Sequence, residues 1–210
     1  MIPVRVLAVR YLANAAAQLC EGLGISPKTP SLAMLTTDCD DATYIALDAA
    51  TKAADVEVVY GRSFYAGAGN ASTPHAGEVI GILAGATPGA VRSGMEAALG
   101  ALEQIGFEDL GGVPCLAWTV SSVGSFLAKE AGVATGTALA YLIAPPLEGM
   151  YAMDAALKAA DVTLCKLYTP PTETNFGGGL LSGTRSACEA ACAAFAQAVA
   201  EVAAHPKGEV

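Results

Sequence analysis

Histidine, tryptophan and charged residues are scarce in this 210-residue sequence. It has two histidines, one tryptophan and only 15% Asp, Glu, Lys and Arg. So few histidines argue against a metal centre and against nucleophilic catalysis, which needs a base beside the nucleophile. The 11 Lys and Arg face 20 Asp and Glu, and the net charge of −9 would repel a nucleic-acid backbone. We expect neither an enzyme nor a nucleic-acid-binding protein, and neither a cofactor nor a bound metal.

The sequence also lacks a membrane-spanning run and a disulfide framework. Hydrophobic residues make up 53% and the mean hydropathy is +0.46, but glycines, a proline and serines interrupt the longest uncharged stretch, 110–128. Arg5 and Arg10 break the N-terminal apolar segment where a signal peptide needs its hydrophobic core. The six cysteines form no CxxC pair, so we expect buried thiols. We predict a cytoplasmic protein without membrane contact, with small Ala and Gly side chains suited to an oligomer.

An internal repeat organises the chain. ALDAATKAADV at 46–56 matches AMDAALKAADV at 152–162, with nine of eleven residues identical. The likeness extends in both directions with small shifts of register. Two copies are too few for a solenoid, so we predict two tandem domains, 1–110 and 111–210.

Both halves show the same mixed pattern of strands and helices. In the first half, strand-like runs such as SLAMLTTD and GEVIGILAG alternate with helical segments such as ALDAATKAAD. Thr87 and Pro88 are typical of a helix start. We predict an α+β fold of two ferredoxin-like domains, each a roughly four-stranded antiparallel sheet with helices mostly on one face.

Several segments resemble one protein family. They are DCDDATYIALDAATKAADVEVVYGRSFYAGAGNAS, AGEVIGILAG, AYLIAPPLEGMYAMDAALKAADV and PPTETNF. With these segments the chain resembles, over nearly its whole length, the bacterial microcompartment shell proteins of the ethanolamine-utilization L type (EutL-like). The resemblance implies two circularly permuted microcompartment domains, a homotrimer that imitates a hexamer, and lateral contacts with other shell proteins. It also implies a structural protein with a gated pore for small metabolites, located in the shell of a cytoplasmic microcompartment.

An acidic cluster, DCDD at 38–41, is the first candidate site. Its side chains could ligate a metal, cap the following helix, or hold a small ammonium compound by charge and cation–π contact. The resemblance favours the third alternative and implies contacts with a small molecule such as ethanolamine. The residues expected to make these contacts are Asp40 or Asp41, Glu78, Phe107 and Asn175.

Two glycine-containing loops at corresponding places are the second candidate site. Glycine allows the backbone to change conformation without strain at a Cβ, as a gate requires. The resemblance implies that these loops close the pore, and the alternative is that they are ordinary turns. The expected gating residues are Tyr65, Ala66, Gly67, Ala68, Gly69 and Asn70 in the first loop, and Glu173, Thr174, Asn175, Phe176, Gly177, Gly178 and Gly179 in the second.

Lys52 and Lys158 occupy the same position in the two copies of the repeat. In shell proteins generally, a lysine on the edge of a tile packs against the next tile, so we predict that both lie on the tile edge. The alternative is a solvated helix face. For the whole chain, the competing function is a trimeric ferredoxin-like module that binds or senses a small ligand, because fold alone does not fix function.

Overall fold

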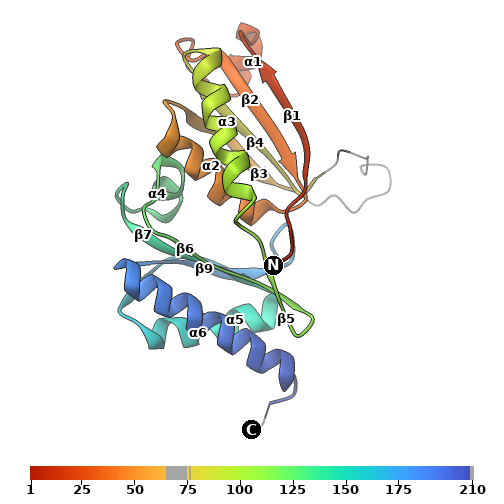
Figure 1. Ribbon diagram of the computed structural model, residues 1–210, viewed down its shortest axis with the longest axis vertical. Coiled ribbons are helices and arrows are strands. Elements are labelled where there is room, and N and C mark those ends of the chain that lie inside the picture. Colours follow the sequence, from red (N-terminus) through yellow and green to blue (C-terminus); the bar gives the residue numbers. More distant parts are fainter. Residues whose placement is uncertain (65–74, 76, 209–210) are drawn as a thin grey trace. The chain divides into compact units, whose positions relative to one another are not determined.

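The computed structural model describes residues 1–64, 75 and 77–208 (Figure 1). The chain divides into two compact units. The N-terminal unit comprises residues 4–105 together with 124–127, and the C-terminal unit comprises residues 1–3, 106–123 and 128–210. Each unit contains one antiparallel sheet. The predicted α+β fold with two antiparallel sheets is therefore confirmed.

The sheet of the N-terminal unit has the strand order β1-β2-β4-β3. Its strands are β1 (Val6–Leu12), β2 (Ser31–Thr37), β3 (Glu57–Ser63) and β4 (Val79–Gly85). Helices α2 (Asp40–Ala53) and α3 (Pro88–Leu102) pack on each other and on the sheet, and α3 lies across it in Figure 1. The short helix α1 (Ala17–Gly22) contributes Cys20 to a separate apolar cluster with Leu32 and Ile82.

The C-terminal unit repeats this plan. Its sheet has the order β5-β6-β7-β9-β8, in which β5 (Glu108–Leu110) is a short added edge strand. The other strands are β6 (Val113–Val120), β7 (Ala138–Ala144), β8 (Val162–Tyr168) and β9 (Gly177–Gly183). Helices α5 (Pro146–Ala159) and α6 (Arg185–Ala204) lie side by side against the sheet (Figure 1). Helix α4 (Ser125–Ala131) begins with residues that belong to the N-terminal unit.

Local sequence explains why the two copies fold alike. The hydroxyl oxygens of Thr87 and Thr184 each accept a hydrogen bond from the backbone N–H three residues later, which caps α3 and α6. Gly24 and Gly132 both have a φ of 67°, a left-handed conformation that favours glycine, just after α1 and α4. Strands β3 and β8 carry their register shifts at equivalent positions. The repeat seen in the sequence is thus also a structural repeat.

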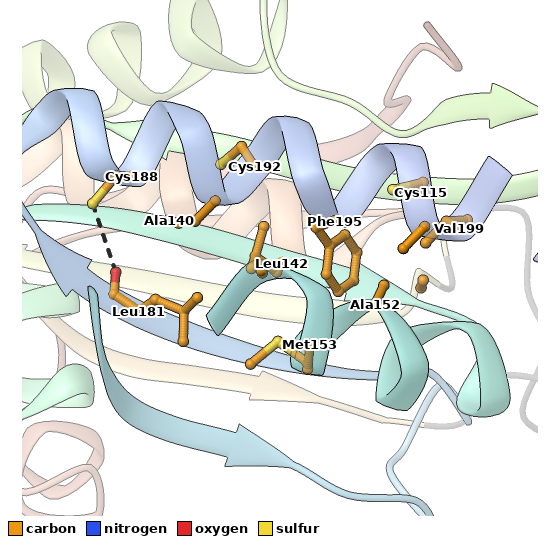
Figure 2. Close-up of a cluster of buried hydrophobic side chains, with 14 of the residues drawn as sticks. Cys115, Ala140, Leu142, Ala152, Met153, Leu181, Cys188, Cys192, Phe195 and Val199 are labelled. Carbon is orange, nitrogen blue, oxygen red and sulfur yellow. Dashed lines mark hydrogen bonds between the residues drawn. The ribbon is translucent and has the colours of Figure 1, made fainter. Parts of the chain in front are cut away.

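The core of the C-terminal unit is built from small and medium side chains. Figure 2 shows Phe195 and Val199 of α6 packed with Leu142 of β7 and Ala152 of α5. The Cys188 thiol points toward the backbone oxygen of Leu181, 3.9 Å away. Helix α6 is long and apolar enough by length and composition to cross a membrane, but its apolar stripe is buried in this cluster. We therefore interpret α6 as a core helix.

Candidate functional site

The acidic cluster lies where β2 ends and α2 begins. Asp38 follows the last residue of β2 and is turned toward Arg5. The Arg5 backbone N–H donates to Asp38 Oδ1 at 2.8 Å, and its Nε donates to Oδ2 at 2.6 Å. These two contacts form a charge-assisted pair at two points. Asp38 therefore serves to attach the chain before β1 to the end of β2, a role that the sequence did not reveal.

Hydroxyl groups hold the turn that leads into α2. The hydroxyls of Thr37 and Thr43 are 2.7 Å apart, and Thr43 Oγ1 also donates to the backbone oxygen of Cys39 at 2.7 Å. Cys39 occupies the N-cap position without a side-chain cap, so neither aspartate caps the helix. Asp40 and Asp41 instead form its first turn and are both buried. Carboxylates at this position are stabilised by the helix dipole.

Glu78 lies beside this turn. Its backbone N–H donates to the Thr37 oxygen at 2.8 Å, which places it just before β4. Partial burial, together with the charges of Asp40 and Asp38, raises the pKa of the Glu78 carboxyl. Burial also raises the pKa of the Cys39 thiol, and the charges of Asp41, Asp40 and Glu78 add to the effect. Such an environment opposes another negative charge and favours a cation.

Close backbone packing fixes the residue before Glu78. A Cβ added to Gly77 would lie 2.0 Å from the Thr37 backbone oxygen and 2.5 Å from Thr36 Oγ1. Glycine is therefore required here by contact with β2, because no other side chain fits. Gly77 is accordingly a buried, tightly packed residue.

The other predicted ligand residues belong to the C-terminal unit. The Phe107 ring packs edge-on against the Phe176 ring, with centroids 5.6 Å apart and planes at 70°. Asn175 has a positive φ of 61°, and its N–H donates to the Thr172 oxygen at 3.2 Å. Thr172 Oγ1 donates in turn to the Phe176 oxygen at 2.8 Å. The expected ligand residues therefore form two groups, Asp40, Asp41 and Glu78 in one unit, and Phe107 and Asn175 in the other.

The expected extent of the second gating loop is wrong. Gly177, Gly178 and Gly179 lie in strand β9, where they pair with β7 and are buried. A Cβ on Gly178 would lie 2.0 Å from the Leu142 backbone oxygen, and one on Gly179 would lie 2.4 Å from the Lys166 oxygen. These glycines permit close approach of neighbouring strands rather than motion. Only the segment 169–176, with Glu173, Thr174, Asn175 and Phe176, connects β8 to β9 as a loop.

The first gating loop lies outside the described residues. Its expected members Tyr65, Ala66, Gly67, Ala68, Gly69 and Asn70 all fall in the segment 65–74.

The two repeated lysines have different surroundings. Lys158 pairs with Asp154 at 2.6 Å, and both side chains are exposed. Lys52 lies 3.4 Å from Asp48 Oδ2, but the Asp48 side chain is fully buried. Asp48 also accepts hydrogen bonds from the backbone N–H groups of Gly124 and Leu127, at 2.7 and 2.9 Å. The sequence analysis singled out the two lysines. In the first copy, however, it is Asp48 that binds the backbone of residues 124–127.

Burial raises the pKa of several cysteine thiols. All six are free thiols, and four of them are buried. Burial raises the pKa of Cys115 to about 12 and that of Cys192 to about 11, so both stay protonated at neutral pH. The raised pKa of Cys39 likewise keeps its thiol protonated at neutral pH. Among the described residues, no group of His, Cys, Asp and Glu side chains could hold a metal ion.

Comparison with known proteins identifies the family. The bacterial microcompartment (BMC) domain model matches residues 31–109. The microcompartment shell protein EutL of Clostridium perfringens is 55% identical over 212 residues, covering 99% of this chain and 98% of its own. The ethanolamine utilization protein EutL of Leptotrichia buccalis has a solved structure with a TM-score of 0.95, 52% identity, and coverage of 99% and 98%.

A more distant structure shares only the fold. It is that of the trimeric microcompartment shell protein PduB, with a TM-score of 0.77, 19% identity, and coverage of 96% of this chain and 90% of its own. The relatives are named as shell proteins, in agreement with the expectation of a structural protein rather than an enzyme. With more than half of its residues identical over the full length, this chain belongs to the EutL family of bacterial microcompartment shell proteins.

Proposed function

We propose that this shell protein forms a trimeric tile with a central pore, through which small metabolites pass under the control of a gate. The observation that carries the proposal is the structural repeat, because three chains with two copies each place six similar units around a ring. The trimeric shell protein that shares this fold supports the same arrangement. Lateral contacts between tiles, and with other shell proteins, then build the shell.

Sedimentation and electron microscopy test the proposed trimer and its assembly into sheets. The protein should sediment at about 63 kDa, three times the 21.0 kDa chain, and should form two-dimensional sheets at high concentration. Lys158→Ala should weaken the sheets and leave the trimer intact, since Lys158 is exposed on α5. Lys52 is less suitable for the test because its loss would also remove the partner of buried Asp48.

Lys28→Ala, which removes a positive charge from an exposed turn, is the matched control for Lys158→Ala. A monomer at micromolar concentration would contradict the tile. A trimer that never forms sheets would favour the alternative, a small-ligand-binding or regulatory module, because such a module gains nothing from tiling.

The acidic cluster is the proposed site for a small ammonium alcohol such as ethanolamine. Asp40, Asp41 and Glu78 provide the negative charge, and a cation relieves the repulsion between Glu78 and Asp40. Phe107 and Asn175 are proposed as further contacts. The loop 169–176, with its Phe176–Phe107 ring contact, is proposed as part of the gate, together with residues 65–70.

Ethanolamine should bind with a dissociation constant of roughly high-micromolar to millimolar size, as two or three charge-assisted contacts allow. Glu78→Gln should weaken binding by roughly tenfold, the effect of losing one such contact. Binding should strengthen as pH rises through the raised pKa of Glu78, since only the ionised carboxylate attracts the ammonium group. Calorimetry across this pH range is the measurement.

Glu96→Gln, on the exposed side of α3, removes a charge elsewhere and should leave the affinity unchanged. If Glu78→Gln binds as tightly as the unmodified protein, Glu78 is not part of the site. Amide exchange across 169–176 in the same titration tests the gate, because a ligand that binds only the closed state must slow exchange there.

A further inference from the structure

The two copies of the repeat differ in how one aspartate is covered. Asp48 of α2 and Asp154 of α5 occupy the same position of the matching segments DAATKAADV and DAALKAADV. The Asp48 side chain is fully buried, whereas that of Asp154 is 65% exposed. Each has its lysine four residues later. The difference therefore arises from what lies over the helix rather than from the helix itself.

Residues 124–127 cover the first copy. Gly124 and Leu127 donate their N–H groups to the Asp48 carboxylate, and the Ser125 N–H donates to Thr51 Oγ1 at 3.1 Å. The Phe126 ring packs on Tyr44 with centroids 5.9 Å apart. It also lies over Gly61, where an added Cβ would be only 3.3 Å from the ring.

The repeat supplies a second segment of the same kind, residues 16–19. Helix α1 begins one residue after Ala16, as α4 begins one residue after Gly124. The turns after the two helices match, with Ile25 N–H donating to the Cys20 oxygen at 2.8 Å and Val133 N–H donating to the Ala128 oxygen at 2.9 Å. Leu127 is fully buried, but its counterpart Leu19 is 44% exposed. The N-cap Ala16 supplies no side-chain cap to α1.

The second copy also has an exposed apolar surface, which lies on α5. Leu147, Tyr151 and Asp154 are spaced four and three residues apart, which puts them on one face of α5. Leu147, Tyr151 and Leu157 are exposed, whereas Ile45, the counterpart of Tyr151, is buried. Side-chain sizes also differ between the copies. In the first copy, the small Gly61 lies under the large Phe126. At the corresponding positions of the second contact, the exposed Leu167 replaces Gly61 and Gln18 replaces Phe126.

We propose that residues 16–19 of a second copy of this chain dock on α5, around Asp154. Leu19 of the partner subunit packs against the apolar face of α5, and the Asp154 carboxylate lies beside the start of the partner's α1. The contact joins different surfaces of the two chains, so it is head-to-tail, and it generates a ring when its rotation closes. This inference rests on the ring-shaped tile proposed above, and names the residues that hold it together.

The proposed contact between chains differs in two details from the contact of residues 124–127 with α2. Ala16 carries a Cβ where Gly124 has none, and a Cβ at Gly124 would lie 2.7 Å from the Asp48 backbone oxygen. Leu157 replaces Thr51, which removes the hydroxyl that accepts from Ser125. The partner's α1 therefore stands further from α5 than residues 124–127 stand from α2, and the larger Leu157 and Leu167 side chains fill the space between the two helices.

Sedimentation of two single variants and of their mixture tests the contact. Asp154→Arg and Leu19→Glu should each weaken ring formation by at least about a hundredfold, since each places an unfavourable charge in the contact. Both positions are exposed, so the melting temperature of the separated chain should change little. Glu201→Arg on α6, an exposed site of the same charge change, should leave the ring unaffected.

The mixture gives the sharper result. Asp154→Arg protein keeps an intact residue 16–19 segment, and Leu19→Glu protein keeps an intact α5 face. An equimolar mixture should therefore form dimers through one intact contact and should not close rings. Rings formed by either variant alone would overturn this inference while leaving the tile in place, whereas a monomeric unmodified protein would overturn the tile itself.

Discussion

Asp48→Ala should lower the free energy of unfolding by about 3–5 kcal/mol, the range for breaking a buried charged interaction on one side. The Asp48 side chain is fully buried and accepts from the N–H groups of Gly124 and Leu127. Alanine would leave both donors without this acceptor and remove the partner of Lys52. Chemical denaturation followed by circular dichroism is the measurement.

The repeat provides a matched control for this substitution. Asp154→Ala removes the same side chain from the same sequence context, but its pair with Lys158 is exposed and should contribute only about 0–1 kcal/mol. Denaturation should be measured at several protein concentrations, because assembly adds to the apparent stability. Equal losses for the two variants after that correction would show that the hydrogen bonds to residues 124–127 contribute little.

Gly178→Ala should destabilise the C-terminal unit by about 3–5 kcal/mol, combining backbone strain with overpacking. Gly178 has a φ of +146°, which residues with a side chain rarely adopt. A Cβ there would also lie 2.0 Å from the Leu142 oxygen, and both atoms belong to paired backbones that cannot easily move. The thermal unfolding midpoint and the yield of folded protein should both fall.

Gly100→Ala is the control for Gly178→Ala. Gly100 lies in α3 with open space around its Cβ position, so alanine should be stabilising by about 0.5–1 kcal/mol. If Gly178→Ala were as stable as the unmodified protein, the start of β9 would have to be free to change conformation, as the sequence first suggested. The expected loss of folding also means that substitutions at 177–179 cannot serve as tests of gating.

Gating is better tested in the segment that remains a loop. Residues 173–176 precede β9, and the Phe176 ring is held by Phe107. Changes at Glu173 or Thr174 alter this segment without entering the strand. The glycine-rich sequence after Phe176 looked like a flexible continuation of the loop because composition alone does not distinguish mobile glycines from close-packed ones.

The sequence by itself determined the organisation of the chain. The repeat of 46–56 at 152–162, with strand-like and helical apolar patterns and a helix start at Thr87, was sufficient to predict two α+β copies with antiparallel sheets. These signals are local, since hydrophobic periodicity and capping act within a few turns of a helix or a few residues of a strand. The family resemblance rests on the same segments and is confirmed by the relatives.

Only the tertiary structure decided what each repeated residue does. Asp48 and Asp154 share their neighbours in sequence, yet one is buried under residues 124–127 and the other is exposed. Asp38 belongs to the acidic cluster by sequence, but it pairs with Arg5, 33 positions away. Burial and partners depend on segments distant in the chain, and the free energy of a charge depends on both. A repeated motif therefore specifies a helix twice, whereas the surface that covers each helix specifies its role.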